Sequence, residues 1–364
     1  MRVPFIDLHL QYKAIQPAID QAISSVMAEG WFIAGDRVRS FEKSFADYLN
    51  TGHCVSMANG HDALCIGLRM LGVGPGDEVI TTAFSWIATA NAISQTGARP
   101  VFVDVDPENG LLDVKRIQEK ITTKTKAIVP VHLYGNCADM DEIMDLAAVH
   151  GLFVVEDAAQ AAGATYRGRK AGTIGHAGAF SFYPTKVLGA YGDAGCLVTN
   201  DPNLAGRCRR YANHGAAFPD HDYQFVGTNS RMDSLQAAVL NVKLTFLDSW
   251  IARRNQLALH YRKGLKDVQS VRFFTEKKDS HRCHYQFPVQ VQNRESLINF
   301  LNTCEIGTSI AYPYSLPGTH PYFDSRHYPE TERLAAQVLS LPLYPEMTES
   351  QVDYVCDKIQ LFLK

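Results

Sequence analysis

Residues 179–195 read AFSFYPTKVLGAYGDAG, and Lys186 lies near the centre of this stretch. The run 179–182 is apolar and typical of a β-strand, and it ends at Tyr183-Pro184-Thr185, so the lysine follows a break in the chain. Hydrophobic neighbours on both sides predict partial burial, and a buried ammonium is paired, changed in its protonation or used covalently. A neutral lysine attacks carbonyl carbons, and an aldehyde cofactor is the carbonyl expected here. Because most lysines lie at the surface, Lys186 alone leaves a surface role open.

Length and composition limit the classes of protein to consider. The chain has 364 residues, of which 46% are hydrophobic and 20% charged, which predicts a globular protein with a large and a smaller domain. Its formal charge of -3 gives no electrostatic basis for binding nucleic acid. We find no run of about 18 apolar residues, which excludes a spanning helix, and no signal peptide at the N-terminus. We therefore expect a cytoplasmic protein.

The eight cysteines are isolated from one another, without a C-x-x-C pair or a nearby cluster at metal-ligand spacing. We expect neither a disulfide nor a metal site, because both need cysteines or histidines grouped in a recognisable pattern. Free cysteine is often buried, so we expect most of these side chains to act as small core residues. They are Cys54, Cys65, Cys137, Cys196, Cys208, Cys283, Cys304 and Cys356.

Short apolar runs alternate with segments of helical period through much of the chain. Strands are predicted at 55–57, 78–82, 99–104, 127–131, 152–157, 179–182, 196–199 and 284–291. Helices are predicted at 15–29, 36–49, 63–71, 87–95, 114–121, 140–150, 204–212, 233–247, 250–265, 294–302 and 351–362. This alternation indicates a mainly parallel sheet covered by helices, in which ligands bind beyond the carboxyl ends of the strands.

Two further features point to such a ligand. A strand, the turn Ala58-Asn59-Gly60-His61-Asp62 and a helix start follow one another, and free N–H groups at a helix start bind phosphate. Many helices begin in this way without a ligand. Asp157 ends an apolar run, where it serves either a functional role or as the cap of a helix expected from Ala158. We leave both roles open for Asp157.

Several ordered motifs together resemble one known family. They are Pro4–Leu8 with Gln11-Tyr12, Asn59–Leu64, Val131–Gly135, Glu156–Gln160, Ser181-Phe182 with Lys186, Asn229–Asp233 and Leu339–Pro345. The chain resembles the DegT/DnrJ/EryC1/StrS sugar aminotransferases, which use pyridoxal 5'-phosphate (PLP) and have the aspartate aminotransferase-like fold of type I. The resemblance implies a large domain, 1–249, with an N-terminal helical arm and a mainly parallel seven-stranded sheet. It also implies a small α+β domain, 250–364.

The resemblance assigns roles to residues around the cofactor ring. Lys186 would bond to the cofactor aldehyde and later carry the transferred proton. Asp157 would pair with the pyridinium nitrogen, and Gln160 would hydrogen-bond the ring hydroxyl. Trp86 matches the position that stacks on the ring. Alternatively Trp86 or Phe84 is a core residue, and we favour stacking for Trp86.

The resemblance also assigns the phosphate and a shared site. The phosphate would lie on the amides of Gly60 and His61, with a hydroxyl from Ser181. Asn229 would reach the phosphate of a neighbouring subunit, which implies a homodimer with shared active sites. Arg231 would bind acidic groups of the substrate or donor, or pair with a nearby carboxylate.

Two departures from the family pattern concern the ligands. His61 replaces the Thr or Ser of many relatives, so a hydroxyl contact to the phosphate is lost. In the C-terminal half, Ala311-Tyr312-Pro313 replaces the usual His-Tyr-Pro, and the segment 314–321 that follows is unusual. This region helps to form the sugar pocket in the family, so Tyr312 and His320 are predicted to contact the substrate.

The predicted function is the transfer of an amino group from L-glutamate to a nucleotide-diphospho keto-(deoxy)sugar, at C3 or C4, by two ping-pong half-reactions. Such amino sugars enter polysaccharides, including lipopolysaccharide. Three alternatives stay open. A PLP-dependent sugar dehydratase of this family would have histidine in place of Lys186. A cyclitol-ketone aminotransferase shares the motifs, and a non-enzymatic regulator would keep the fold alone.

Overall fold

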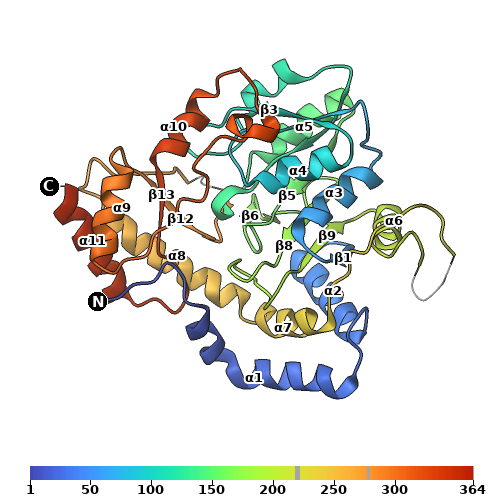
Figure 1. Cartoon of the computed structure of the whole chain (residues 1–364), viewed down its shortest axis with the longest axis horizontal. Coiled ribbons are helices and arrows are strands. Elements are labelled where there is room, and N and C mark those ends of the chain that lie inside the picture. The colour runs from blue at the N-terminus through green and yellow to red at the C-terminus, as the bar shows by residue number, and fades with distance from the viewer. Residues whose placement is uncertain (218–221, 277–278, 364) are drawn as a thin grey trace.

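A computed structural model describes residues 1–217, 222–276 and 279–363. Its centre is a seven-stranded sheet that is parallel except for one strand (Figure 1). The strand β9 (Gly195–Thr199) runs antiparallel to both of its neighbours. In sheet order the strands are β1 (His53–Met57), β9, β8 (Ala177–Ser181), β5 (Phe153–Asp157), β4 (Thr125–Val129), β2 (Glu78–Thr82) and β3 (Arg99–Val103). The predicted mainly parallel sheet is confirmed.

Helices cover both faces of this sheet, which is why its strands are mostly buried and largely apolar. One face packs against α3 (Gly60–Met70), α4 (Ile87–Gln95) and α6 (Pro202–Ala212). The other face packs against α2 (Asp36–Leu49), α5 (Met140–His150) and α7 (Ser234–Leu244). The long helix α1 (Leu8–Glu29) contacts α7 from outside through Ile15 and Ile19.

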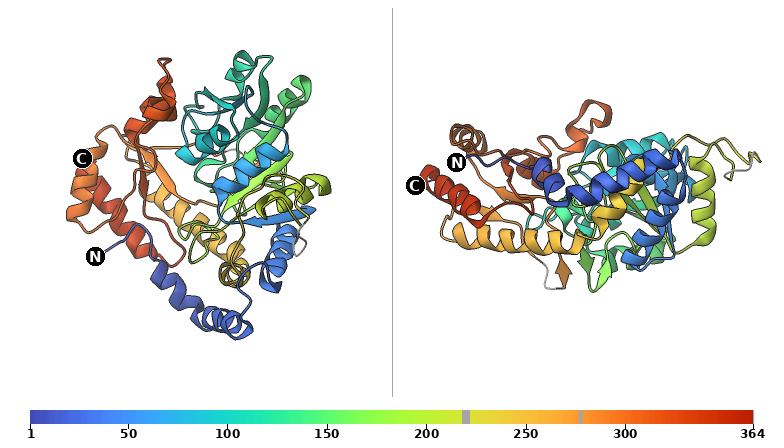
Figure 2. Two further views of the ribbon diagram at one scale, coloured as in Figure 1. Left: turned by 45° about the vertical axis from the view of Figure 1, so that its right-hand side comes forward. Right: turned by 90° about the horizontal axis from the view of Figure 1, so that it is seen from below.

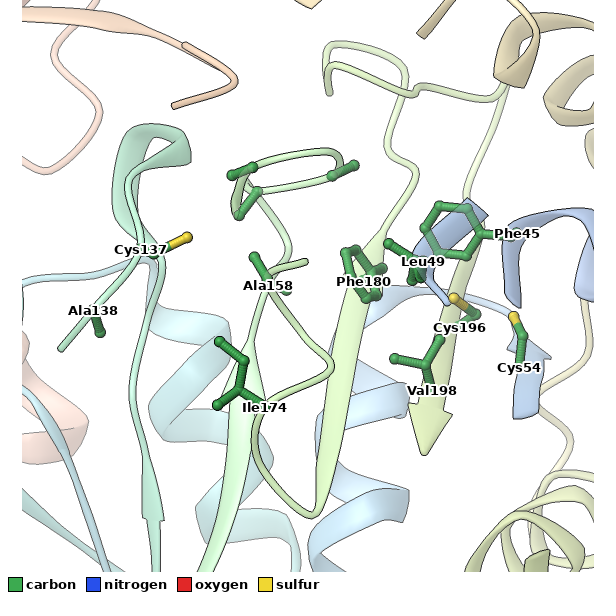
Figure 3. Close-up of a cluster of buried hydrophobic side chains, with 14 of the residues drawn as sticks. Phe45, Leu49, Cys54, Cys137, Ala138, Ala158, Ile174, Phe180, Cys196 and Val198 are labelled. Carbon is green, nitrogen blue, oxygen red and sulfur yellow. The ribbon is translucent and has the colours of Figure 1, made fainter. Parts of the chain in front are cut away.

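Aromatic side chains fill the core on the α2 side. Figure 3 shows Phe45 and Leu49 beside Phe180, with Cys196 and Val198 on the neighbouring strand. The rings of Phe45 and Phe180 meet edge to face with their centroids 5.1 Å apart, an arrangement that aromatic pairs favour. The buried cysteines in this cluster act as small apolar residues.

A second core forms around the C-terminal elements. A small sheet of β10 (Arg272–Phe273), β12 (Phe287–Gln290) and β13 (Val338–Leu341) packs with helices α8 (Leu247–Gly264), α9 (Arg294–Thr303) and α11 (Glu349–Leu363). Val3 belongs to this core and forms a bridge to Ile306. Both views in Figure 2 accordingly place the N-terminus beside the C-terminal elements. The remaining elements are α10 (Pro329–Gln337), β6 (Thr165–Tyr166), β7 (Arg169–Lys170) and β11 (Ser280–His281).

Two predicted helices are wrong. Residues 114–121 form two short 3-10 turns, Val114–Arg116 and Gln118–Lys120. Val114, Ile117 and Ile121 all contact the core, and 3-10 turns also bring residues three apart to one side, so the spacing does not distinguish them from an α-helix. After Asp157 the chain makes two consecutive turns, closed by bonds from Ala161 N to Ala158 O and from Ala164 N to Ala161 O. Asp157 therefore caps no helix here. The helix α10 and the strand β13 were not predicted.

Membrane insertion can be judged for the described helices. None of those in residues 1–217, 222–276 and 279–363 combines the length and the hydropathy needed to cross a bilayer.

The Phe45–Phe180 contact gives a test of the core. Phe180 is 1% exposed, so Phe180→Ala should lower the free energy of unfolding by about 3–5 kcal/mol, because it leaves a cavity between α2 and the sheet. Denaturant unfolding followed by circular dichroism measures the change. Leu259→Ala, at a side chain that is 63% exposed, is the control and should change stability by less than about 0.5 kcal/mol. Equal losses in the two variants would contradict this description of the core.

Candidate active site

A cavity of about 510 Å³ opens at the carboxyl ends of β2, β4, β5 and β8. Residues from all four strand ends, from the start of α3 and from segments 285–286 and 309–312 form its wall. The predicted site residues that line it are Gly60, His61, Trp86, Asp157, Gln160, Ser181, Lys186 and Tyr312. The position agrees with the rule that open α/β sheets bind ligands at this edge.

The carboxylate of Asp157 is buried at the end of β5 and is fixed by two hydrogen bonds. Thr89 Oγ1 on α4 donates to Oδ2 at 2.8 Å, and the amide of Ala159 donates to Oδ1 at 3.2 Å. The hydroxyl of Ser85 lies 3.1 Å from that of Thr89. The pKa of Asp157 is raised overall, because the effect of burial exceeds that of the bond from Thr89, the Ala159 amide and the charge of Lys186, which lower it. These donors favour the ionised carboxylate in a place where water is excluded.

Glu156 fixes β5 on the side away from Asp157, because neighbouring strand residues point to opposite faces. His132 Nε2 lies 2.7 Å from Glu156 Oε2, and both side chains are fully buried. The amide of Ala138 donates to His132 Nδ1, so the proton of the neutral ring is on Nε2 and Nε2 donates to Glu156. Glu156 also accepts hydrogen bonds from the amides of Gly172, Ile174 and Gly175. Every oxygen of this buried carboxylate is therefore satisfied.

Gln160 is oriented by its own side-chain oxygen. Oε1 accepts a hydrogen bond of 2.7 Å from the amide of Tyr134, so the NH₂ group must point the other way. That NH₂ group donates to the hydroxyl of Tyr312 in the cavity wall. Since an amide nitrogen carries two hydrogens, one remains for a further acceptor.

The start of α3 lies unusually close to the sheet. A Cβ atom on Gly60 would lie 2.7 Å from Ser181 Cβ, and one on Gly195 would lie 2.3 Å from the carbonyl carbon of Asn59. Asn59 caps the helix by accepting from Asp62 N at 2.8 Å. Within the described chain, the amides of Gly60 and His61 have no acceptor, since the first N–H groups of a helix lack an internal partner. They are therefore free for an anion.

Lys186 lies on a tight loop and is partly buried. Its own amide donates to Tyr183 O, and the amide of Ala190 donates to Phe182 O, which closes the loop. The ammonium Nζ lies over the ring of Tyr285, 4.5 Å from the centroid. The partial burial expected from the sequence is thus present.

Two polar residues of α7 hold the far half of this loop. Lys243 Nζ donates to Gly189 O at 2.7 Å, and Gln236 Oε1 accepts from Tyr191 N at 2.9 Å. The ammonium of Lys243 also lies 4.1 Å from the centre of the Tyr191 ring. Lys243 is fully buried, and this burial lowers its pKa to about 7, against a small opposing effect of the Glu346 carboxylate.

The exposed fractions of Phe84 and Trp86 show which of the two is a core residue. Phe84 is fully buried and is a core residue, whereas Trp86 is 61% exposed and lines the cavity. The core interpretation is therefore wrong for Trp86.

Three predicted site residues lie outside this cavity. Asn229 is exposed and forms a bridge with Asn213, and His320 is exposed at the start of the 3-10 turn His320–Tyr322. Arg231 donates to Asn213 Oδ1 at 3.1 Å and lines a separate cavity of about 300 Å³ with Arg209. The single chain does not bring these three side chains to Lys186.

Thr89 and Tyr285 are among the residues of the cavity wall that sequence reasoning missed. Thr89 stands three residues after Trp86, a spacing that puts both near one face of α4, and this could have identified it. Nothing in the local pattern around Tyr285 distinguishes it from a strand residue, because its contact with Lys186 spans about a hundred residues of sequence.

Comparison with known proteins shows the family of the chain. The model of the DegT/DnrJ/EryC1/StrS aminotransferase family matches residues 13–360. A protein of Geobacillus stearothermophilus named "Pleiotropic regulatory protein" is 44% identical and covers 100% of this chain and 99% of its own length. The dTDP-3-amino-3,4,6-trideoxy-alpha-D-glucose transaminase of Streptomyces venezuelae is 41% identical over 99% of this chain and 96% of its own length.

Solved structures give the same result for the fold. The crystal structure of S. venezuelae DesV in complex with a ketimine intermediate superposes with a TM-score of 0.97, at 41% identity, over 100% of this chain and 99% of DesV. NtdA from Bacillus subtilis, with bound cofactor PMP, superposes with a TM-score of 0.92, at 32% identity, over 100% of this chain and 85% of NtdA. The expected fold of type I is confirmed.

The buried ammonium of Lys243 gives a test by pH. Its folded pKa of about 7 lies below the ordinary lysine value near ~10.4, so the folded protein binds fewer protons than the unfolded chain between these values. The stability of the wild type should therefore rise with pH through this window, relative to Lys243→Met. Denaturant midpoints from about pH 6.5 to about pH 9 measure the difference.

The exposed Lys263 on α8 provides the matched control for this test. Lys263→Met should give a curve parallel to that of the wild type, because an exposed lysine has nearly the same environment in both states. A parallel curve for Lys243→Met as well would contradict the buried state of its ammonium.

Proposed function

Because the chain belongs to the DegT/DnrJ/EryC1/StrS aminotransferase family, we propose that its cavity binds PLP and transfers an amino group to a nucleotide-activated keto-sugar. One observation carries the proposal. Lys186, Asp157 and Gln160 line the same cavity as the free amides at the start of α3. These groups offer a nucleophile, an anion, an amide donor and a phosphate site together.

The residues present fit the two ends of PLP. The amides of Gly60 and His61 and the hydroxyl of Ser181 would hold the phosphate, since helix starts bind anions through free N–H groups. The close approach of Gly60 to Ser181 brings these donors to one place. The His61 side chain is not counted as a donor to the phosphate, because its Nδ1 lies 3.5 Å from Asp62 Oδ1 and would use the ring proton there.

The remaining groups fit the ring. Asp157 would pair with the ring nitrogen, Gln160 would donate to the ring hydroxyl, and Trp86 would cover one face with its exposed indole. Lys186 would hold the aldehyde carbon. When bound, PLP supplies an electron sink for the substrate carbon that loses its proton.

Residues of the chain would stabilise the charges and move the proton during the reaction. The amine of Lys186 accepts the proton of the reacting carbon and returns it at the end of the half-reaction. Asp157 must stay ionised to hold a positive ring nitrogen, and the donors Thr89 and Ala159 stabilise that charge against its burial. Glu156 and its partners keep β5 in place behind the carboxylate.

Substrate charge supports a shared site. Of the described residues that line the cavity, Lys186 is the single lysine or arginine, whereas L-glutamate and a nucleotide diphosphate both carry several negative charges. We propose that Asn229 and Arg231 complete the cavity of the partner subunit in a homodimer. Asn229 is exposed, and Arg231 lines a cavity separate from that of Lys186 in one chain, which fits this arrangement.

For the substrate we propose amination at C3, with L-glutamate as donor. The S. venezuelae relative is named for a 3-amino sugar, which supports C3 over C4. Tyr312, which accepts a hydrogen bond from Gln160 in the cavity wall, would contact the sugar, whereas His320 would need to act from another position. Assays with keto-inositol and with the keto-sugar nucleotide, each as amino acceptor, distinguish a cyclitol-ketone aminotransferase from a sugar aminotransferase.

A regulatory role is the second candidate, because the Geobacillus relative carries a regulatory name. The polar set around Lys186 argues for catalysis, since a protein without chemistry has no need of a nucleophile beside a fixed carboxylate. A sugar dehydratase is disfavoured because position 186 is lysine.

Visible absorbance of the purified protein tests the proposal. With PLP the wild type should become yellow, and L-glutamate should bleach this colour; a keto-sugar nucleotide should then restore it. Lys186→Ala should show neither the bound yellow cofactor nor its bleaching by L-glutamate. A wild type that stays colourless with PLP, or that ignores amino donors, would exclude the aminotransferase function and favour the regulator.

Thr89→Val tests the support of Asp157. The variant keeps the shape of the side chain but removes the hydrogen bond to a buried carboxylate, which is a charge-assisted bond. We expect kcat/KM to fall by about tenfold to a hundredfold. Ser85→Ala, which changes the neighbour of Thr89 without touching Asp157, should cost less than about threefold. Equal effects of the two variants would mean that Thr89 acts through general packing.

A further inference from the structure

The ring of Tyr285 contacts the amine of Lys186. The ammonium Nζ lies 4.5 Å from the centre of its ring, and both residues line the cavity. A cation over an aromatic face at this distance is attracted by the ring quadrupole. The free lysine therefore has a defined resting place in the cavity wall.

The main chain around this ring is firmly held. Arg254 on α8 is buried, and its Nη1 donates to the carbonyls of His284 at 3.2 Å and Leu343 at 2.8 Å. His284 has a φ of +46°, a left-handed conformation that is rare for residues other than glycine and needs such support. On the other side, the hydroxyl of Tyr285 lies 3.5 Å from Thr185 Oγ1, the residue before Lys186.

An aromatic face suits a lysine that must alternate between its neutral and its protonated form. A carboxylate in this place would form an ion pair and would also compete for the proton. The ring face attracts the ammonium and has no atom that accepts its proton. It can therefore stabilise the lysine while it carries a proton and still release it.

We propose that Tyr285 is a further catalytic residue, whose ring receives Lys186 whenever the lysine is free and stabilises the ammonium that carries the transferred proton. This role rests on the proposed transaminase function. In this proton transfer the C–H bond of the substrate carbon breaks and an N–H bond forms on Lys186. The electron pair of the C–H bond stays with the carbon. The same proton is returned later, so Lys186 ends unchanged.

The contact can be tested without the cofactor. In the PLP-free protein, trace acetylation with acetic anhydride reports the neutral fraction of each lysine, and mass spectrometry quantifies it at Lys186. Tyr285→Leu removes the ring face, so acetylation of Lys186 near pH 7 should become about twofold to thirtyfold faster. Tyr285→Phe keeps the face and should stay within about twofold of the wild type.

Alkaline pH separates charge from access. Near pH 11, above the ordinary lysine pKa of about 10.4, a larger fraction of the amine is neutral in both proteins, so the ratio of the acetylation rates of Tyr285→Leu and the wild type should be smaller than at pH 7. A ratio as large at pH 11 as at pH 7 would show that the leucine variant merely opens the cavity to the reagent, and would overturn the proposal. Unchanged acetylation of Lys186 at pH 7 would overturn it too.

The chain offers a matched control pair on α11. Lys358 Nζ lies 5.3 Å from the centre of the Tyr354 ring, far along the sequence from the cavity. Tyr354→Leu should speed acetylation of Lys358 and leave Lys186 unchanged, and Tyr285→Leu should do the reverse. A change at both lysines in one variant would indicate general loosening of the fold and contradict a specific contact.

The loaded enzyme gives the second measurement. Tyr285→Leu should lower kcat with little change in KM, because the ring acts on the lysine and not on the substrate; Tyr285→Phe should keep kcat within about threefold. An equal loss of kcat in both variants would assign the effect to the hydroxyl and reject the role of the face. If the wild type failed to take up PLP, the proposed function would fail, whereas the acetylation result would still report the Tyr285–Lys186 contact.

Discussion

The buried carboxylate of Asp157 is the constraint on which the cavity depends. Burying a charge at the end of a central strand costs free energy, which hydrogen-bond donors offset. Here the donors are Thr89 on α4 and the amide of Ala159. Glu156, one residue earlier, makes the opposite face of the strand equally rigid through His132 and three loop amides. Two adjacent acidic residues thus fix one strand end from both sides.

Lys186, the proposed nucleophile, is held by a different part of the fold. Lys186 lies on a loop whose far half is fixed by Lys243 and Gln236 of α7, on the α2 side of the sheet. The free amides come from α3 on the other side. The cavity therefore lies where elements from both faces of the sheet meet at its carboxyl edge, which is the usual ligand position in such folds.

Much of this could be predicted from the sequence, because it follows from local patterns. Apolar runs gave the strands, and the ends of those runs placed Asp157 and Lys186 at one edge. The family resemblance and the fold of type I are confirmed. The helix at 114–121 was wrong because the spacing of Val114, Ile117 and Ile121 fits 3-10 turns as well as an α-helix. Thr89 and Tyr285 act through residues distant in sequence, which no local pattern contains.

We propose that Lys186 is the residue that binds the cofactor. Borohydride reduction of the PLP-loaded protein, followed by peptide mass spectrometry, tests this assignment. A phosphopyridoxyl group should appear on the peptide that contains Lys186, and Lys243 should stay unmodified. A label on any other lysine, or no label after loading, would show that Lys186 does not bind the cofactor.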